Sequence, residues 1–282
     1  MSGAIHQRAL GRRRGERRRP YVRRLPSALS RSLRDSWQFA ADPEFIHSIA
    51  EQQIRTSLSR DGVATVEGVL EQDRCARVDR ELQRQLQSSA RPEFGSIHGK
   101  DTRLDLPLRM TGPIADALVA LVARIGAILI AELGADARLV ELSAIQALPG
   151  ASAQPPHPDA GGSGDPDEAR LLTVFVLLTD VGRDRGPLEV WPGSHVPPGK
   201  PDEVAELSRR SSRLMTGSAG TAVLMDARTW HRGTANTTAT PRPVFYASWL
   251  STGTRPEGPT WSLHDSIPKS LTLGMLSRQH RM

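Results

Sequence analysis

The stretch LLTVFVLLTDVGRDRGPLEVWPGSH, residues 171–195, indicates the fold class of this chain. Its first eight residues are apolar except for Thr173, and a second short run, LEVW, follows a Gly-Pro pair and ends before Pro-Gly. Short apolar runs that are bounded by glycine and proline are typical of buried β-strands. The stretch therefore predicts two strands, at 170–179 and 187–191, joined by a tight loop.

Similar runs lie on both sides of this stretch. Residues 138–148, 220–226 and 243–250 are rich in Val, Leu, Ile and Thr and are separated by loops with glycine and proline. Residues 138–250 thus predict many short strands with turns between them, as in a β-sandwich or barrel.

The first half of the chain has helical periodicity instead. Helical patterns cover residues 43–60, 71–87 and 111–134. Asp42 and Thr111 are suited to cap the first and third helix, and Gly62 and Gly134 are suited to end them. Residues 88–110 are expected to be irregular. Helices followed by short strands predict an α+β protein, mainly β, with N-terminal helices packed on a strand core.

Charge divides the chain into a tail and a body. Residues 1–34 carry eleven Arg against one acid, Glu16, whereas the whole chain has a net charge of +6, so the remainder is net negative. We expect residues 1–41 to form an Arg-rich disordered tail and residues 42–282 to form one domain, helical over 42–134 with its strand core at about 138–250.

Other features of composition exclude several protein classes. A single cysteine, Cys75, excludes an internal disulfide framework and a thiolate-rich zinc site. The most apolar run, 114–133, contains Asp116, Arg124 and Glu132, which favours a core helix over a membrane span. The N-terminal segment has no apolar run of the signal-peptide kind, so we expect a cytoplasmic location.

The segment PPHPDAGG, residues 155–162, contains a candidate metal site. In extended backbone, the side chains of His157 and Asp159 point to the same face, because they are two residues apart. One imidazole and one carboxylate are two thirds of the 2-His-1-carboxylate set that binds non-haem Fe(II). The third ligand must then come from a distant histidine.

Four histidines lie downstream as candidates for that ligand: His195, His231, His264 and His280. His231 is favoured because it comes just after the apolar run 220–226. Arg242 follows it at the start of the next strand pattern, and a guanidinium is suited to bind a carboxylate through two hydrogen bonds.

These motifs resemble those of the phytanoyl-CoA dioxygenase family of Fe(II)- and 2-oxoglutarate-dependent oxygenases. The matching stretches are ALPG…HPD (147–159), LLTVFVLLTDV…GPLEVWPGSH (171–195) and D…WHRGTANTTATPRP (226–243), in the order found in the family. The resemblance covers about residues 45–250. It implies a double-stranded β-helix, a jelly-roll or cupin-like core that carries the site at one end.

The resemblance also implies roles for individual residues. By motif position, His157, Asp159 and His231 are the iron ligands, and Arg242 binds the distal carboxylate of 2-oxoglutarate. Three further residues are implied to contact this co-substrate or to line its pocket: Gln146, Thr173 and Phe175.

The reaction implied by the resemblance is the hydroxylation of a small organic molecule, such as a natural-product intermediate. Fe(II), 2-oxoglutarate and O2 supply the oxidant, and succinate and CO2 are released. Desaturation, epimerisation and ring formation use the same residues, so they stay open, as does a catalytically silent ligand-binding homologue. Related halogenases replace the carboxylate ligand by a small residue, so the presence of Asp159 disfavours halogenation.

A small-molecule substrate is the expected partner, with no requirement for nucleic acid and no membrane span; the oligomeric state stays open. Pocket-shaping segments are expected at 88–110, 160–169 and 196–219. The pI of about 10.3 suggests a nucleic-acid-binding protein instead, but the basic residues concentrate in the tail. That alternative predicts salt-dependent binding that is lost when residues 1–34 are deleted.

Overall fold

The computed structural model of the protein describes residues 49–88, 102–161, 165, 167–195, 207, 210–258 and 263–279. The Arg-rich tail, the start of the first expected helix and large parts of the segments 88–110 and 196–219 lie outside the described residues.

The described elements are four helices and nine strands in a mixed order. The helices are α2 (Ile49–Asp61), α3 (Gln72–Ser88), α4 (Gly112–Leu133) and α6 (Leu273–Gln279). The strands are β1 (Val63–Val66), β2 (Arg103–Pro107), β3 (Arg138–Ala147), β4 (Leu171–Leu177), β5 (Leu188–Val190), β6 (Arg213–Met215), β7 (Ala222–Asp226), β8 (His231–Gly233) and β9 (Arg242–Leu250).

The strands form two antiparallel sheets. The larger sheet has six strands in the order β1-β7-β4-β9-β3-β2, and the smaller has three in the order β6-β5-β8. All pairings in the larger sheet are antiparallel, and β4 and β9 lie at its centre. Every residue of β4 and β9 is buried, which explains why both appear in the sequence as nearly continuous apolar runs.

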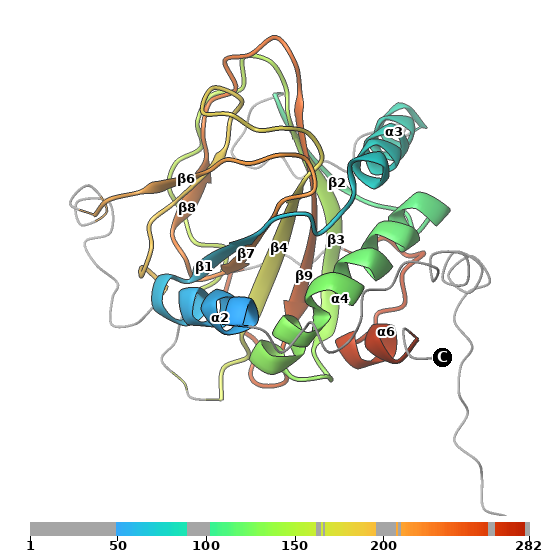
Figure 1. Ribbon diagram of the computed structural model, residues 1–282, viewed down its shortest axis with the longest axis vertical. Helices are drawn as coiled ribbons and strands as arrows, with labels where there is room; N and C mark the ends of the chain where they lie inside the picture. The colour runs from blue at the N-terminus through green and yellow to red at the C-terminus, as the bar shows by residue number, and fades with distance from the viewer. Residues whose placement is uncertain are drawn as a thin grey trace, which may run out of the picture.

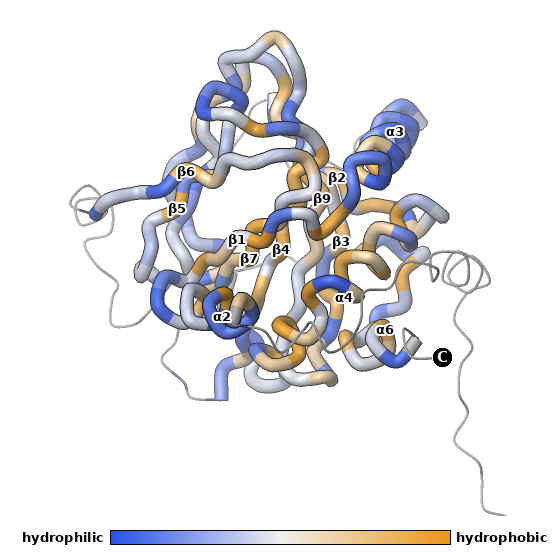
Figure 2. The backbone as a smooth tube through the Cα atoms, in the orientation of Figure 1, coloured by the Kyte–Doolittle hydropathy of each residue, from blue (hydrophilic) through white to orange (hydrophobic). Residues whose placement is uncertain are grey.

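One face of the larger sheet is covered by helices. Alternate residues of the central strands, such as Val174, Phe245 and Ala247, share an apolar core with α4 and α3. Figure 1 shows α2, α4 and α6 along this side of the sheet, and Figure 2 shows orange, apolar backbone where α4 meets the strands. The described structure is therefore a mainly antiparallel α+β fold with helices packed on the sheet.

The opposite face of the larger sheet is turned toward the smaller one. Phe175, Val223, Val244 and Tyr246 point to this side and belong to a second apolar cluster with Val190 of β5 and other residues. Figure 1 shows β6 and β8 on this side, across from β4 and β7. The two sheets enclose the space in which the candidate site lies.

The helix ends agree with their sequence signals. Thr111 is at the N-cap position of α4, although its side chain forms no capping hydrogen bond; a proline occupies the first turn, and Gly134 ends the helix with a φ of 83°. By length and composition α4 could cross a membrane, and 56% of its most apolar window is buried inside the protein. The apolar side chains of its inner face, including Leu118, Leu121 and Ile125, are fully or nearly fully buried in the core, as expected of a core helix.

Several elements differ from the sequence expectation. Strand β2 lies within the segment 88–110, which was expected to be irregular; it is an edge strand paired with β3. Strands β6 and β8 have three residues each, too few for a recognisable alternation, and were not predicted. Helix α6 was also missed, and it packs against α4.

Candidate metal centre and co-substrate pocket

The two histidines of the candidate site are direct partners in an isolated antiparallel β-bridge, with His231 in β8 and His157 in the segment before β4. The backbone N–H of His157 donates to the carbonyl of His231 at 2.9 Å, and the N–H of His231 donates to the carbonyl of His157 at 2.9 Å. Side chains of directly opposed residues project to the same face of an antiparallel pair. The imidazole rings are accordingly 4.6 Å apart between centroids. Residues 74 positions apart in sequence are thus placed side by side.

The third group comes from the continuation of the same extended segment. The backbone N–H of Asp159 donates to the carbonyl of Ala227 at 2.8 Å, which keeps the chain beside the segment that precedes β8. The Oδ1 atom of Asp159 lies 3.5 Å from Nε2 of His231 and 3.8 Å from Nε2 of His157. One ligand atom from each residue lies within 4.8 Å of the others, so the three could hold one metal ion.

Hydrogen bonds orient both imidazoles for ligation. Nδ1 of His157 is 2.8 Å from the carbonyl of Pro155, and Nδ1 of His231 is 2.9 Å from the carbonyl of Thr229. A carbonyl can only accept, so each neutral ring carries its proton on Nδ1 and presents an unprotonated Nε2 to the site. Burial, and next the proximity of His231, lowers the pKa of His157, which favours the neutral form that a metal requires.

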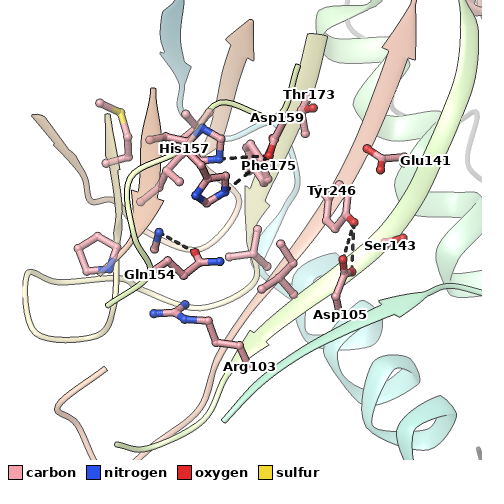
Figure 3. Close-up of a pocket in the computed structure, with 18 of the residues that line it drawn as sticks. Arg103, Asp105, Glu141, Ser143, Gln154, His157, Asp159, Thr173, Phe175 and Tyr246 are labelled. Carbon is pink, nitrogen blue, oxygen red and sulfur yellow. Dashed lines mark hydrogen bonds and ion pairs between the residues drawn. The ribbon is translucent and has the colours of Figure 1, made fainter. Parts of the chain in front are cut away.

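The three residues line a cavity of about 620 Å³ between the two sheets. Figure 3 shows His157 and Asp159 pointing into it, with Phe175 beside them. Thr173 and Phe175 of β4 also line the cavity, as does Arg242 at the start of β9. The structure therefore brings together six of the seven residues proposed from the sequence.

Gln146 is the exception. It does not line the cavity, and its side-chain carbonyl accepts a hydrogen bond of 2.8 Å from Gln83 of α3. Its neighbour Ile145 does line the cavity, and adjacent residues of a strand point to opposite faces. Gln146 thus faces the helices. Among the described residues, the amide side chain that lines the cavity is that of Gln154, which accepts a bond from the N–H of Gly233.

Arg242 and Arg103 provide positive charge at one end of the cavity. Both are only 6% exposed, and neither forms an ion pair with a carboxylate among the residues that the structure describes. Within the described part of the chain, Nε of Arg242 and both Nε and Nη1 of Arg103 have no hydrogen-bond partner. Nη2 of Arg103 donates to the carbonyls of Ser152 and Thr234, which hold it in place.

Burial, and next the charge of Arg103, lowers the pKa of Arg242 to about 9. Arg242 is therefore still charged at neutral pH. An unpaired buried cation is costly in free energy, so the two guanidinium groups form a site suited to an anion.

Several residues of the cavity were not proposed as site residues from the sequence, among them Arg103, Asp105, Glu141 and Tyr246. Arg103 and Asp105 lie in RLDLP, whose alternation of polar and apolar residues is a signal for a half-buried strand. Glu141 is a polar residue inside the strand pattern 138–148, on the same face as Ile145 by alternation. Neither of these sequence signals shows that the polar side chains face a cavity.

A buried ion network supports the strand that leads to His231. Asp226, at the end of β7, is fully buried and accepts hydrogen bonds from Arg170 at 2.8 Å and from Arg228 at 2.8 and 2.9 Å. Arg170 also pairs with Glu132 of α4 at 2.6 Å. Burial by itself raises the pKa of Asp226, but the bonds and charges of the two arginines hold it below its ordinary value.

Comparisons with known proteins agree with this geometry. The family model described as phytanoyl-CoA dioxygenase matches residues 58–244, which is more than half of the chain. Among solved structures, the non-heme alpha-ketoglutarate-dependent epimerase SnoN from nogalamycin biosynthesis is similar, with a TM-score of 0.60 and 23% identity, over 82% of this chain and 97% of that one.

Two further structures are similar in fold. EctD from S. alaskensis, in complex with 2-oxoglutarate and 5-hydroxyectoine, gives a TM-score of 0.61 and 20% identity, over 85% of this chain and 90% of that one. The non-heme alpha-ketoglutarate-dependent carbocyclase SnoK gives a TM-score of 0.59 and 20% identity, over 71% and 84%. By its match over residues 58–244, the chain belongs to the phytanoyl-CoA dioxygenase family and is an enzyme of the iron- and 2-oxoglutarate-dependent oxygenase class.

Proposed function

We propose that this protein is a non-haem Fe(II)- and 2-oxoglutarate-dependent dioxygenase that hydroxylates a small organic molecule. The observation that carries the proposal is the convergence of His157, Asp159 and His231 in a cavity that also contains Arg242, whose Nε has no hydrogen-bond partner among the described residues. The two antiparallel sheets that face each other across this cavity support a double-stranded β-helix as the scaffold.

The donor set fits an iron ion. Two neutral imidazoles that present Nε2 and one carboxylate form a 2-His-1-carboxylate set, which leaves other coordination positions open. When bound there, Fe(II) with 2-oxoglutarate and O2 supplies the oxidising equivalents, and succinate and CO2 are the by-products. The carbonyls of Pro155 and Thr229 fix the rings, so the protein holds the ligand geometry before the metal arrives.

The cationic end of the cavity would bind the co-substrate. Arg242 offers a charged fork for the carboxylate of 2-oxoglutarate that is remote from the metal, and Arg103 adds a second positive charge beside it. Register supports this arrangement, because Arg103 and Arg242 both pair with Ala147 and so lie in one row across β2, β3 and β9. Thr173 and Phe175 would form part of the wall nearer to the metal ligands.

An anaerobic titration tests the cofactor assignment without turnover. Metal-free protein is titrated with Fe(II) and 2-oxoglutarate while the visible metal-to-ligand charge-transfer band is recorded. We expect the band in the wild type, its loss in His157→Ala, and a ten-fold or greater increase in the 2-oxoglutarate concentration required by Arg242→Ala, about 1.4 kcal/mol or more.

Matched control variants are available outside the cavity. His264→Ala and Arg213→Ala remove a histidine and an exposed arginine that do not line it, and both should retain the wild-type band. Absence of the band in folded wild-type protein would overturn the proposal. Once a substrate is found, product analysis decides between hydroxylation and desaturation, epimerisation or ring formation.

A further inference from the structure

The wall of the cavity away from the arginine pair is acidic. In the register of β3 and β9, Ala147 pairs with Arg242, while Glu141 pairs with Ser248. The arginine row and the Glu141 row are thus separated by six residues along the sheet, or roughly 20 Å at the rise of a β-strand. Asp105 of β2 pairs with Ile145, so it lies between these rows, two residues from the arginine row and four from the Glu141 row, and both carboxylates line the cavity. Figure 3 shows Glu141, Tyr246 and Asp105 together on this wall.

Both carboxylates accept hydrogen bonds from hydroxyl groups. The hydroxyl of Tyr246 donates to Asp105, with both oxygens at 3.1 Å. Ser248 donates to Glu141 at 2.5 Å, and Thr173 lies 2.9 Å from the Ser248 hydroxyl. Burial raises the pKa of Tyr246 well above its ordinary value, so this hydroxyl keeps its proton and acts as a donor. The hydrogen bonds therefore favour the ionised form of each carboxylate.

Neither carboxylate has a cationic partner among the described residues. No ion pair joins Asp105 or Glu141 to a basic side chain in that part of the protein, whereas buried Asp226 has two arginines. Burial raises the pKa of Asp105 to about 6 and that of Glu141 to about 7, which is the effect of desolvation without a compensating cation.

The arginine row is thus far from Glu141, and Asp105 lies between the two. The buried nitrogens of Arg242 and Arg103 that lack a hydrogen-bond partner among the described residues point to an anionic ligand in the cavity, and the two carboxylates are left for another ligand. We propose that Glu141 and Asp105 bind a positively charged nitrogen of the substrate, so that the enzyme oxidises a small molecule bearing an ammonium group. This proposal rests on the proposed function, which assigns the arginine end to 2-oxoglutarate.

The aromatic side chains of this wall suit the same ligand. The rings of Phe175 and Tyr246 are 5.7 Å apart between centroids and both line the cavity. Aromatic faces attract ammonium groups and also cover the alkyl carbons that carry them. The wall thereby offers two carboxylates for the charge and two rings for the attached apolar surface, close to the metal ligands.

The proposal is tested with a charged probe and its neutral isostere. Benzylamine, which is protonated at pH 8, and benzyl alcohol are titrated by calorimetry into the anaerobic protein loaded with Fe(II) and 2-oxoglutarate. We expect the amine to bind at least ten-fold more tightly than the alcohol. Glu141→Gln and Asp105→Asn, which keep the side-chain size, should each reduce this preference about ten-fold, and Glu71→Gln, an exposed carboxylate outside the cavity, should leave it unchanged.

The charge-transfer band tests the binding of iron and 2-oxoglutarate independently of the ammonium site. A normal band in the wild type with no preference for the amine would overturn the ammonium site and leave the cofactor assignment standing. Retention of the full preference in the Glu141→Gln/Asp105→Asn double variant would also overturn it. Absence of the band would reject the proposed function, and the same titration of metal-free protein then decides whether the acidic wall selects the amine.

Discussion

His157 and His231 exchange both of their backbone hydrogen bonds, each at 2.9 Å, and this pairing places their imidazoles on one face. The ligand pair is therefore positioned by main-chain atoms, which do not depend on either side chain. The carbonyls of Pro155 and Thr229 accept from Nδ1 of the two imidazoles and so keep each ring's proton on Nδ1. The candidate metal centre is thus preorganised by the strand pairing itself.

Metal addition should stabilise the wild type and not a ligand variant. At an Fe(II) concentration a hundred times the Kd, the free energy of unfolding should rise by about 2.7 kcal/mol, seen as an increase in Tm under anaerobic conditions. His157→Ala should lose this increase, yet its metal-free Tm should stay near that of the wild type because the backbone pair remains. A large drop in the metal-free Tm of this variant would contradict the preorganised arrangement.

Removal of Asp226 should cost far more than removal of a surface acid. Asp226→Ala leaves the guanidinium groups of Arg170 and Arg228 without their buried partner, which predicts a loss of about 3–5 kcal/mol in the free energy of unfolding. Glu71→Ala, at an exposed site, should change it by about 0.5 kcal/mol or less. Urea unfolding measures both, and equal effects would refute the role of the network.

The half-buried carboxyl of Glu141, desolvated in the cavity wall, should make the metal-free protein less stable as pH rises. Its pKa is raised from an ordinary 4.5 to about 7, so between these values the unfolded chain releases the proton while the folded protein retains it. The free energy of unfolding is therefore highest below pH 4.5. It falls by up to about 3 kcal/mol as pH rises to about 7.

Glu141→Gln removes this titration. The variant should gain stability relative to the wild type between pH 5 and pH 8, in urea unfolding measured at both values. Glu71→Gln serves as the control and should follow the wild type. An unchanged pH dependence in Glu141→Gln would show that the carboxyl is not desolvated.

Gly62 should be far less tolerant of substitution than another glycine of similar backbone conformation. Gly62 has a φ of 72°, and a Cβ there would meet Oγ1 of Thr229 and lie 2.5 Å from Nδ1 of His195. Gly134 has a φ of 83° with open space around it. Gly134→Ala should cost about 1 kcal/mol from the backbone alone, and Gly62→Ala at least about 2 kcal/mol more because of the clash. Similar unfolding midpoints for the two variants would contradict the close packing at Gly62.

Cys75 should be unreactive in the folded protein. Its side chain is fully buried, and burial raises the pKa of the thiol to about 11, so almost no thiolate is present at pH 8. A colorimetric thiol reagent should label it only on addition of denaturant. Rapid labelling of native protein would show that α3 opens readily from the core.

The site shows both the strength and the limit of sequence reasoning. His157, Asp159, His231 and Arg242 were identified because their motifs occur in a set order along the chain, and the structure brings all four to one cavity. Gln146 was chosen by motif position as well, but strand alternation turns it toward Gln83 on the helical side. Motif order shows that residues belong to a site, whereas the face on which each lies depends on register.

Local sequence thus determined the ends of α4 at Thr111 and Gly134, the buried strands β4 and β9, and the residue types of the candidate metal site, because helix-end signals and hydrophobic periodicity act within a few positions. Tertiary structure alone decided that Arg103 joins Arg242, that Asp105 and Glu141 share an acidic wall, and that three-residue strands such as β8 form at all. These features depend on pairing between segments far apart in sequence, and no local pattern encodes which strands become neighbours or which of their faces encloses the cavity.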